Sequence, residues 1–451
     1  DRSSAASDVY KRQVYPVLHF DFSVSKYITA DMLSAVINRQ LLLWEKIYQR
    51  EEGETTFSLR FEGIIRRAYK QTGKQVVVLI DEYDSPMLDS NHNDEVQKEI
   101  RNIMRDFFSP LKAQGQYLRF LLLTGISKFS QMSIFSELNN LQNISMRDDY
   151  SAICGITEQE LRTQLQIDIE QMAQANKETY EEACVHLKQQ YDGYHFSKNC
   201  VDIYNPFSLF NAFAQKSYEN FWFSTGTPTF LIDILQESDF DIRELDNTTA
   251  TAEQFDAPSN RITDPLPVLY QSGYLTIKGY DPDFQLYTLA YPNKEVRKGF
   301  IESLMPAYVH LPARENTFYV VSFIKDLRIG HLEECLERLK SFFASIPNKL
   351  NNKEEKHYQT IFYLFFRLMG QYIDVEVDTA IGRADAVVKL QDTIYVFEFK
   401  VDGTPEEALT QINSKKYAIP YQADHRKIVK VGVNFDSATR TIGEWKIELG
   451  S

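Results

Sequence analysis

The stretch that decides the fold lies near the carboxyl end of the 451-residue chain: GRAD at residues 382–385, then TIYVFEFK at residues 393–400. β-Branched and aromatic residues dominate the second part, which is typical of a β-strand. Side chains alternate between the two faces of a strand, so Glu398 and Lys400 share a face with Val396. Placing two charges on an otherwise apolar face is costly and requires a reason.

A hairpin would bring a second carboxylate to Glu398. Residues 383–390 also have the composition of a strand, and residues 391–392 fit a two-residue turn. If the hairpin closes there, Asp385 lies opposite Glu398, where two carboxylates repel each other unless a cation neutralises them. Mg²⁺ or Mn²⁺ suits such oxygens. Lys400 would then orient a water molecule or stabilise charge on a phosphate, so the pattern predicts metal-dependent phosphodiester cleavage.

The spacing alone also fits a structural interpretation. In that interpretation Asp385 is a turn residue, and Glu398 merely pairs with Lys400 at a sheet edge. The flanking sequence favours the functional one, because residues 404–407 (TPEE) combine a capping box with proline at the first helical position. Gln411 lies on the helix that starts there.

A helix with Glu355 in its first turn is also expected upstream, over residues 353–369. The order of these residues resembles the PD-(D/E)XK nuclease fold. Residues 395–409 (YVFEFKVDGTPEEAL) and 411–418 (QINSKKYA) are similar to the nuclease domain attached to a family of bacterial AAA-ATPase-like proteins. Ala384 stands where the motif has proline, a departure that the superfamily often shows.

This resemblance implies a role for each candidate residue. Asp385 and Glu398 would bind the metal ion, Mg²⁺ or Mn²⁺, and Lys400 would position the attacking water. Glu355 and Gln411 would be supporting residues of the same catalytic site.

The composition sets the class of protein. Hydrophobic residues make up 43% and aromatic residues 13%, which indicates globular domains. Four scattered cysteines without a C-x-x-C pair favour a reduced, cytoplasmic setting without structural zinc. No apolar stretch approaches the roughly 20 residues of a membrane span, so we expect no membrane partner. The net charge of −14 is unusual for an enzyme that acts on nucleic acid, because phosphates attract basic surfaces.

The N-terminal third predicts a second site. The apolar run at residues 75–80 is typical of a buried parallel strand and ends in Asp81 and Glu82. An acidic pair at this place resembles a Walker B motif, although strands that end in Asp-Glu are also common elsewhere. A second such strand, residues 118–123, is followed by Thr124, which suits a sensor residue at the neighbouring strand's tip.

Other phrases extend the resemblance to the AAA-ATPase-like family over residues 14–451, among them IDEYDSPM and FWFSTGTPTFLI. It implies that Asp81 serves Mg²⁺ and that Glu82 activates water. The phosphate-binding sequence G-x-x-x-x-G-K-[ST] does not occur. In the family it precedes the buried strand expected at residues 15–20. We therefore expect the chain to begin after it, and ATP to be a cofactor of the full-length protein.

The expected fold class is α/β, with an incomplete P-loop-type ATPase core, a helical lid and winged-helix-like region, and an α/β PD-(D/E)XK nuclease-like domain. The expected segments are residues 1–13, non-native or disordered; 14–150, the AAA-ATPase-like core; 151–310, the lid region; 311–345, a helical linker; and 346–451, the nuclease-like domain.

The function that this organisation predicts is metal-dependent hydrolysis of DNA phosphodiester bonds, linked to an AAA-type ATPase module. The alternative is a non-catalytic regulatory module that binds nucleic acid or protein and carries a degenerate ATPase. Nucleic acid, DNA in the first instance, is the expected partner, and a homo-oligomer is allowed.

Overall fold

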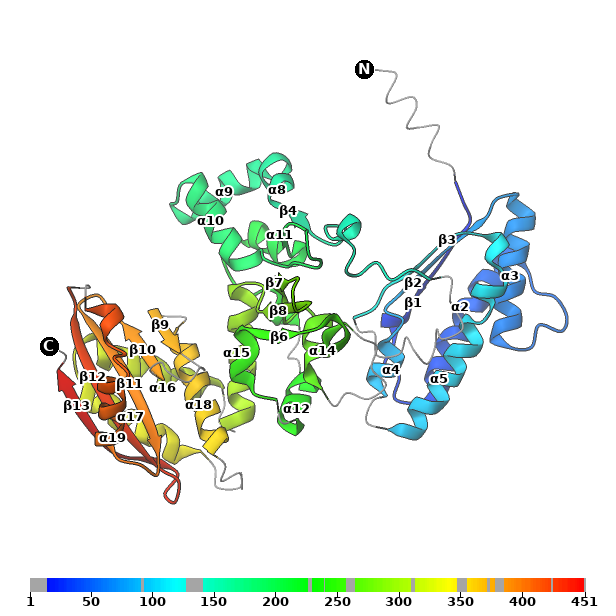
Figure 1. The fold of residues 1–451 in the computed structure, drawn as a ribbon. Coiled ribbons are helices and arrows are strands. Elements are labelled where there is room, and N and C mark those ends of the chain that lie inside the picture. Colours follow the sequence, from blue (N-terminus) through cyan, green and yellow to red (C-terminus); the bar gives the residue numbers. More distant parts are fainter. Residues whose placement is uncertain are drawn as a thin grey trace. The chain divides into compact units, whose positions relative to one another are not determined.

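A computed structural model describes residues 14–90, 93–126, 141–225, 229–238, 240–256, 264–309, 313–346, 355–370, 374–377, 385–422 and 425–449. The chain forms two compact units. The N-terminal unit comprises Asp1–Ser145 and Thr251–Ser272, and the C-terminal unit comprises Met146–Ala250 and Gly273–Ser451. Figure 1 labels their helices and strands.

The N-terminal unit contains a three-stranded parallel sheet in the order β1-β2-β3. Its strands are β1 (Val17–Asp21), β2 (Val76–Asp81) and β3 (Leu118–Leu123), close to the three apolar runs that predicted them. The inward-facing side chains share one core with helices α2 (Ala30–Tyr48), α3 (Phe57–Thr72) and α5 (Asp94–Phe108). The short helix α4 (Ser85–Asp89) follows β2.

The expectation that these strands are buried is wrong for the outer two. Val17 in β1 is 51% exposed and Phe120 in β3 is 52% exposed. In β1 buried and exposed side chains alternate, and β3 contains no fully buried residue. Within the described residues each outer strand has a single strand neighbour, so its apolar side chains are only partly covered.

The first part of the C-terminal unit is mainly helical, as predicted. Its helices include α8 (Glu158–Gln164), α9 (Gln166–Asn176), α10 (Tyr180–Tyr191), α11 (Pro206–Gln215), α12 (Thr229–Glu237), α15 (Lys294–Val309), α16 (Ala313–Arg328) and α17 (Leu332–Ser345). Thr157 and Asn205 accept backbone N–H groups at the starts of α8 and α11, which confirms two predicted helix starts.

Residues 266–289, expected as short strands, form a helix before the strands begin. Asp264 accepts the backbone N–H of Leu266 at 2.9 Å and Pro265 occupies the first helical position, so α14 (Pro265–Gln271) forms in the N-terminal unit. In the C-terminal unit, β7 (Thr276–Asp281) and β8 (Leu286–Ala290) pair with β6 (Thr248–Ala250) in the order β6-β8-β7.

The remaining residues form a five-stranded mixed sheet in the order β13-β12-β11-β10-β9. The strands are β9 (Asp374–Val377), β10 (Ala386–Lys389), β11 (Thr393–Val401), β12 (Lys427–Asp436) and β13 (Thr441–Leu449). Only β11 and β12 run parallel. Helix α18 (Glu355–Met369) precedes the sheet, and α19 (Pro405–Ser414) connects β11 to β12.

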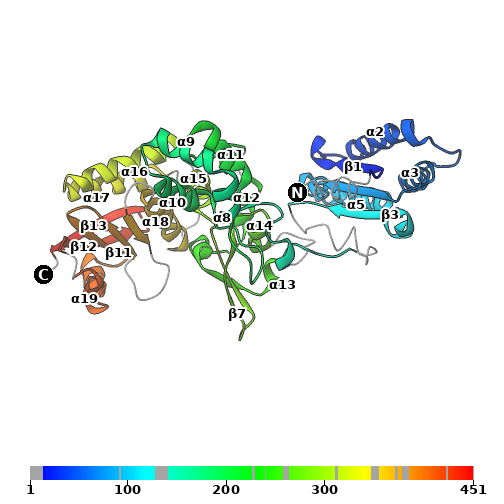
Figure 2. The ribbon, with the colours of Figure 1, turned by 90° about the horizontal axis from the view of Figure 1, so that it is seen from above.

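The two faces of β11 pack against different helices, which confirms the predicted alternation. Phe399 faces α18, where its ring lies 4.1 Å from that of Phe362. Val396, on the opposite face, shares a core with Leu409 and Ile412 of α19. Figure 2 shows α17 and α18 on one side of the sheet and α19 on the other. The candidate charged residues of β11 therefore lie on the face that α19 covers.

Gly432 sets how closely α19 approaches the sheet. This residue of β12 pairs with Glu398 across the parallel ladder. A Cβ atom at position 432 would lie 2.3 Å from the backbone oxygen of Pro405 and 3.0 Å from Cγ of Leu409. Because only glycine leaves room here, the first turn of α19 packs directly over the strand.

We expect Gly432→Ala to destabilise the C-terminal unit by about 1–3 kcal/mol, because the added methyl group forces α19 away from β12. Urea unfolding measures the effect. Gly279→Ala is the matched control, since a Cβ in this strand position makes only ordinary contacts with Thr288, the nearest at 3.6 Å. Equal unfolding midpoints for the two variants would contradict this account of the helix contact.

Candidate active site

The β10–β11 hairpin has the register that the sequence predicted. Ala386 pairs with Phe397, and the Leu390 N–H donates to the Thr393 carbonyl at 2.8 Å across the turn. The next residues outward from the first pair are Asp385 and Glu398. Asp385 follows β10's entry and its Oδ2 accepts the Phe399 backbone N–H at 2.8 Å, so its carboxylate is fixed against β11.

Glu398 is a buried carboxylate, with 1% of the residue exposed. Its Oε1 accepts a hydrogen bond from Lys400 Nζ at 3.1 Å. Its Oε2 is buried and has no hydrogen-bond partner among the described residues. Burial, and then the nearby charge of Asp385, raise the Glu398 pKa to about 7, although Lys400 acts in the opposite direction. An unsatisfied buried oxygen of this kind is costly unless another group binds it.

Burial also raises the pKa of Asp385. Three groups oppose that shift by favouring the charged form: the Phe399 N–H and the positive charges of Lys400 and Arg243. Each carboxyl therefore destabilises the other's charge, as expected for a pair that a cation neutralises.

Lys400 is held by two partners. Besides its bond to Glu398, its Nζ donates to Gln411 Oε1 at 2.6 Å. Gln411 Nε2 in turn donates to the hydroxyl of Tyr417 at 3.1 Å. The predicted capping box between Thr404 and Glu407 is present and starts α19 so that Gln411 faces β11.

Glu355 and Tyr417 complete the account of the predicted residues. Glu355 is the first residue of α18, as expected, but its side chain lies outside the described residues. Sequence reasoning missed Tyr417, although it belongs to the QINSKKYA stretch that also contains Gln411. The signal was its position just beyond α19, where the chain turns back toward the sheet.

The predicted N-terminal residues also lie together, at the carboxyl edge of the parallel sheet. The Thr124 hydroxyl donates to Asp81 Oδ1, and the Tyr83 N–H donates to the Thr124 carbonyl at 3.0 Å. Glu82 has a positive φ of 52°. Its pKa is raised by burial first and then by Asp84, Asp81 and Asp21.

Sequence reasoning missed the last two of those carboxylates that could have been found. Asp21 directly follows a predicted strand and pairs with Asp81 in register. Asp84 is fully buried, and its Oδ1 accepts the Ile126 N–H at 3.2 Å, which ties the loops after β2 and β3 together. The carboxyl ends of parallel strands converge at one edge, so Asp21 was predictable from its position alone.

Comparison with known proteins matches both arrangements. A family model of predicted AAA-ATPases matches residues 3–135, and one of the PD-(D/E)XK nuclease superfamily matches residues 353–445. A relative from Azotobacter chroococcum mcd 1, described as an uncharacterized protein in the vnfD 5′ region, is 33% identical over 447 residues, 96% of this chain and 83% of the relative. The chain belongs to this AAA-ATPase-like family. No solved structure matches it significantly.

The superfamily match directs attention to the metal. PD-(D/E)XK nucleases typically use divalent metal ions, and the residues present fit one: Glu398 Oε2 is buried and unsatisfied, and Asp385 lies beside it. The described residues contain no ready-made cluster of three His, Cys, Asp or Glu ligands. Mg²⁺ is often held by only one or two carboxylates, with waters and substrate phosphates completing its shell.

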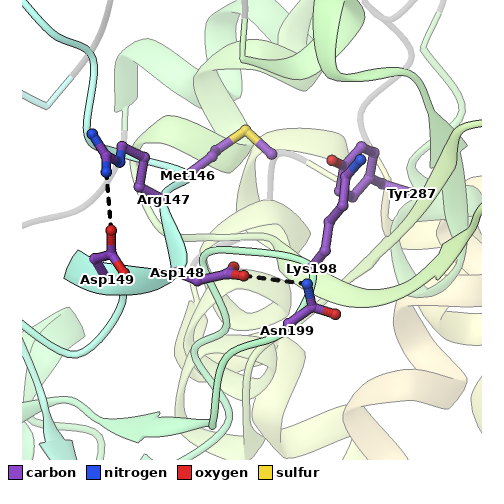
Figure 3. Close-up of a pocket in the computed structure, with 7 residues that line it drawn as sticks. All are labelled: Met146, Arg147, Asp148, Asp149, Lys198, Asn199 and Tyr287. Carbon is purple, nitrogen blue, oxygen red and sulfur yellow. Dashed lines mark hydrogen bonds and ion pairs between the residues drawn. The ribbon is translucent and has the colours of Figure 1, made fainter.

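Two further observations concern the rest of this AAA-ATPase-like protein. None of the helices in the described ranges combines the length and apolarity needed to cross a membrane. A cavity of about 370 Å³ in the C-terminal unit is lined by Met146, Arg147, Asp148, Asp149, Lys198, Asn199 and Tyr287 (Figure 3). Its charged groups have partners: Arg147 pairs with Asp149 at 2.9 Å and Asn199 donates to Asp148 at 3.2 Å. No predicted site residue lines it.

Without metal ions, Glu398 should make folding stability depend on pH. Its pKa is about 7 when folded, against an ordinary value of 4.5, so the folded protein keeps this proton to higher pH than the unfolded chain. Stability that is present below pH 4.5 is then lost as the pH rises through 7. We expect wild type to lose on the order of 3 kcal/mol relative to Glu398→Gln over this interval, because glutamine does not titrate.

Urea unfolding in a chelator at pH 4.5 and pH 8 measures this difference. Glu448→Gln is the control, since this carboxylate is 43% exposed and paired with Lys430 at 2.9 Å. A stability difference between wild type and Glu398→Gln that stays constant with pH would contradict the raised pKa.

Proposed function

We propose that the C-terminal domain hydrolyses DNA phosphodiester bonds with Mg²⁺ or Mn²⁺. One observation carries this proposal: the buried, unpartnered Oε2 of Glu398 beside Asp385, with Lys400 fixed on the same strand. A metal ion at Asp385 and Glu398 would supply Lewis-acid activation of water and phosphate. The superfamily match supports a nuclease, and the choice of DNA follows from it by analogy.

The protein's own groups would prepare the attack. Lys400 is held by Glu398 and Gln411, so its ammonium group has a fixed position from which to orient a water molecule. The water oxygen forms a bond to phosphorus while the bond to the leaving ribose oxygen breaks. The same ammonium charge favours the extra negative charge on the phosphate in the transition state.

The N-terminal unit supports a second proposal, ATP hydrolysis in the full-length protein. The contact between Thr124 and Asp81 and the position of Glu82 suit Mg²⁺ binding and water activation at a strand edge. ATP binding is placed with the full-length protein because the G-x-x-x-x-G-K-[ST] sequence is not among these 451 residues. A cytoplasmic location and a homo-oligomer also remain proposals.

The alternative is a non-catalytic binding module. A scaffold needs no buried carboxylate with an unsatisfied oxygen, since an apolar residue in its place would remove the cost. The presence of Glu398 beside Asp385 therefore favours the enzyme.

We expect Lys400→Ala to lower cleavage of DNA by a factor of roughly 10²–10⁴, because the variant loses the charge that orients water and stabilises the phosphate. Linear, circular and single-stranded DNA with Mg²⁺ or Mn²⁺ provide the assay. Lys430→Ala is the matched control: this lysine on β12 is bound to Asn413 and Glu448, away from Asp385. Equal cleavage by both variants would reject Lys400 as catalytic, and no cleavage by wild type would favour the binding module.

We also expect wild type to bind Mn²⁺ and the double variant Asp385→Asn, Glu398→Gln to lose that binding, since amides are much weaker ligands than carboxylates. Isothermal titration calorimetry measures the affinity, with Glu448→Gln as the charge-matched control. Unchanged Mn²⁺ affinity in the double variant would remove the basis for the metal site.

A further inference from the structure

A charged segment of the helical region docks on the nuclease-like domain. The short 3₁₀ helix η5 (Ile242–Asp246) ends in Asp246, whose Oδ2 forms ion pairs with Arg367 of α18 at 2.6 Å and with Arg297 of α15 at 3.1 Å. Arg367 is only 14% exposed, which makes its pair with Asp246 the more strongly desolvated of the two. The pair holds η5 against the carboxyl-terminal part of α18.

Helix α18 connects this docking point to the candidate active site. The ring of Phe366, next to Arg367, lies 5.8 Å from that of Phe399 on β11. The backbone N–H of Phe399 is the donor that fixes Asp385. A short series of direct contacts thus leads from η5 to a metal-binding carboxylate.

Arg243, on η5, presents a guanidinium group in this neighbourhood. Asp241 grips it from one side: Nε donates to Oδ1 at 2.9 Å and to Oδ2 at 3.0 Å, and Nη2 donates to Oδ2 at 2.5 Å. The side chain remains 25% exposed. Its charge reaches Asp385, because Arg243 and Lys400 are the two cations that lower the pKa of that carboxyl, against the effect of burial.

We propose that Arg243 is a substrate-binding residue of the nuclease site, contributed by the helical region, which contacts a backbone phosphate of the nucleic acid. The inference rests on the proposed nuclease function. A phosphate at Asp385 and Glu398 approaches two carboxylates, and Lys400 is already bound to Glu398 and Gln411. An arginine fork matches phosphate oxygens, and Asp241 fixes its orientation in advance.

A purely structural role is the competing explanation. Asp241 also accepts the backbone N–H of Arg243 at 3.0 Å, and this bond caps η5 without any need for the guanidinium group. Replacing the side chain alone therefore separates the two roles, because the cap survives and the charge is lost.

The test measures binding of DNA in Mg²⁺ on a Lys400→Ala background, which prevents cleavage, at several salt concentrations. We expect Arg243→Gln to weaken binding about tenfold and to reduce the slope of log affinity against log salt by about one, the effect of one lost phosphate contact. Arg243→Lys should keep the slope but bind more weakly, because it retains the charge and loses the fork. Arg297→Gln is the control, since it removes an arginine that also pairs with Asp246.

The outcomes separate this inference from the proposed function. Equal affinities and salt slopes for Arg243→Gln and Arg297→Gln, with cleavage by wild type intact, would overturn the role of Arg243 alone. If Arg243→Gln fails to fold, Arg243→Lys decides: weaker binding with an unchanged slope supports the inference, and unchanged affinity overturns it. Failure of wild type to bind or cleave DNA would overturn the nuclease function, and this inference with it.

Discussion

The burial of the Glu398 carboxylate is the constraint on which the C-terminal domain depends. It lies on a central strand, beneath α19, with one oxygen bound to Lys400 and the other unsatisfied. Its surroundings follow from that position: glycine at 432 lets α19 approach, and Gln411 on α19 reaches the lysine. The opposite face of the strand is free of charge and packs on α18 through aromatic rings.

The sequence predicted the part of this site that is local. Alternation along one strand and a two-residue turn were enough to place Asp385 opposite Glu398, because hairpin register follows from turn length. The capping box at Thr404 likewise placed Gln411, since a helix start fixes which residues share a face. The role of Tyr417 depended on how the chain turns after α19, which no local pattern specifies.

The sequence could not predict features that depend on what lies beside an element. Leu118–Leu123 is as apolar as a central strand, yet it has a single strand neighbour among the described residues and is half-exposed. A run of apolar residues reports composition and not coverage. Arg243 is a sharper case, because it lies more than a hundred residues before Asp385 and reaches it only through the docking of η5 on α18.

The energetics of the site argue for chemistry over a scaffold role. An apolar residue at 398 would pack against Val396 and α19 without desolvating a charge, and replacing buried ionic groups by apolar ones is often neutral or stabilising. The observed arrangement instead leaves one carboxylate oxygen unsatisfied and raises the pKa of both carboxyls. Proteins accept such local costs mainly where function requires them. A divalent cation removes both costs at once, since it binds the free oxygen and neutralises the mutual repulsion of the pair.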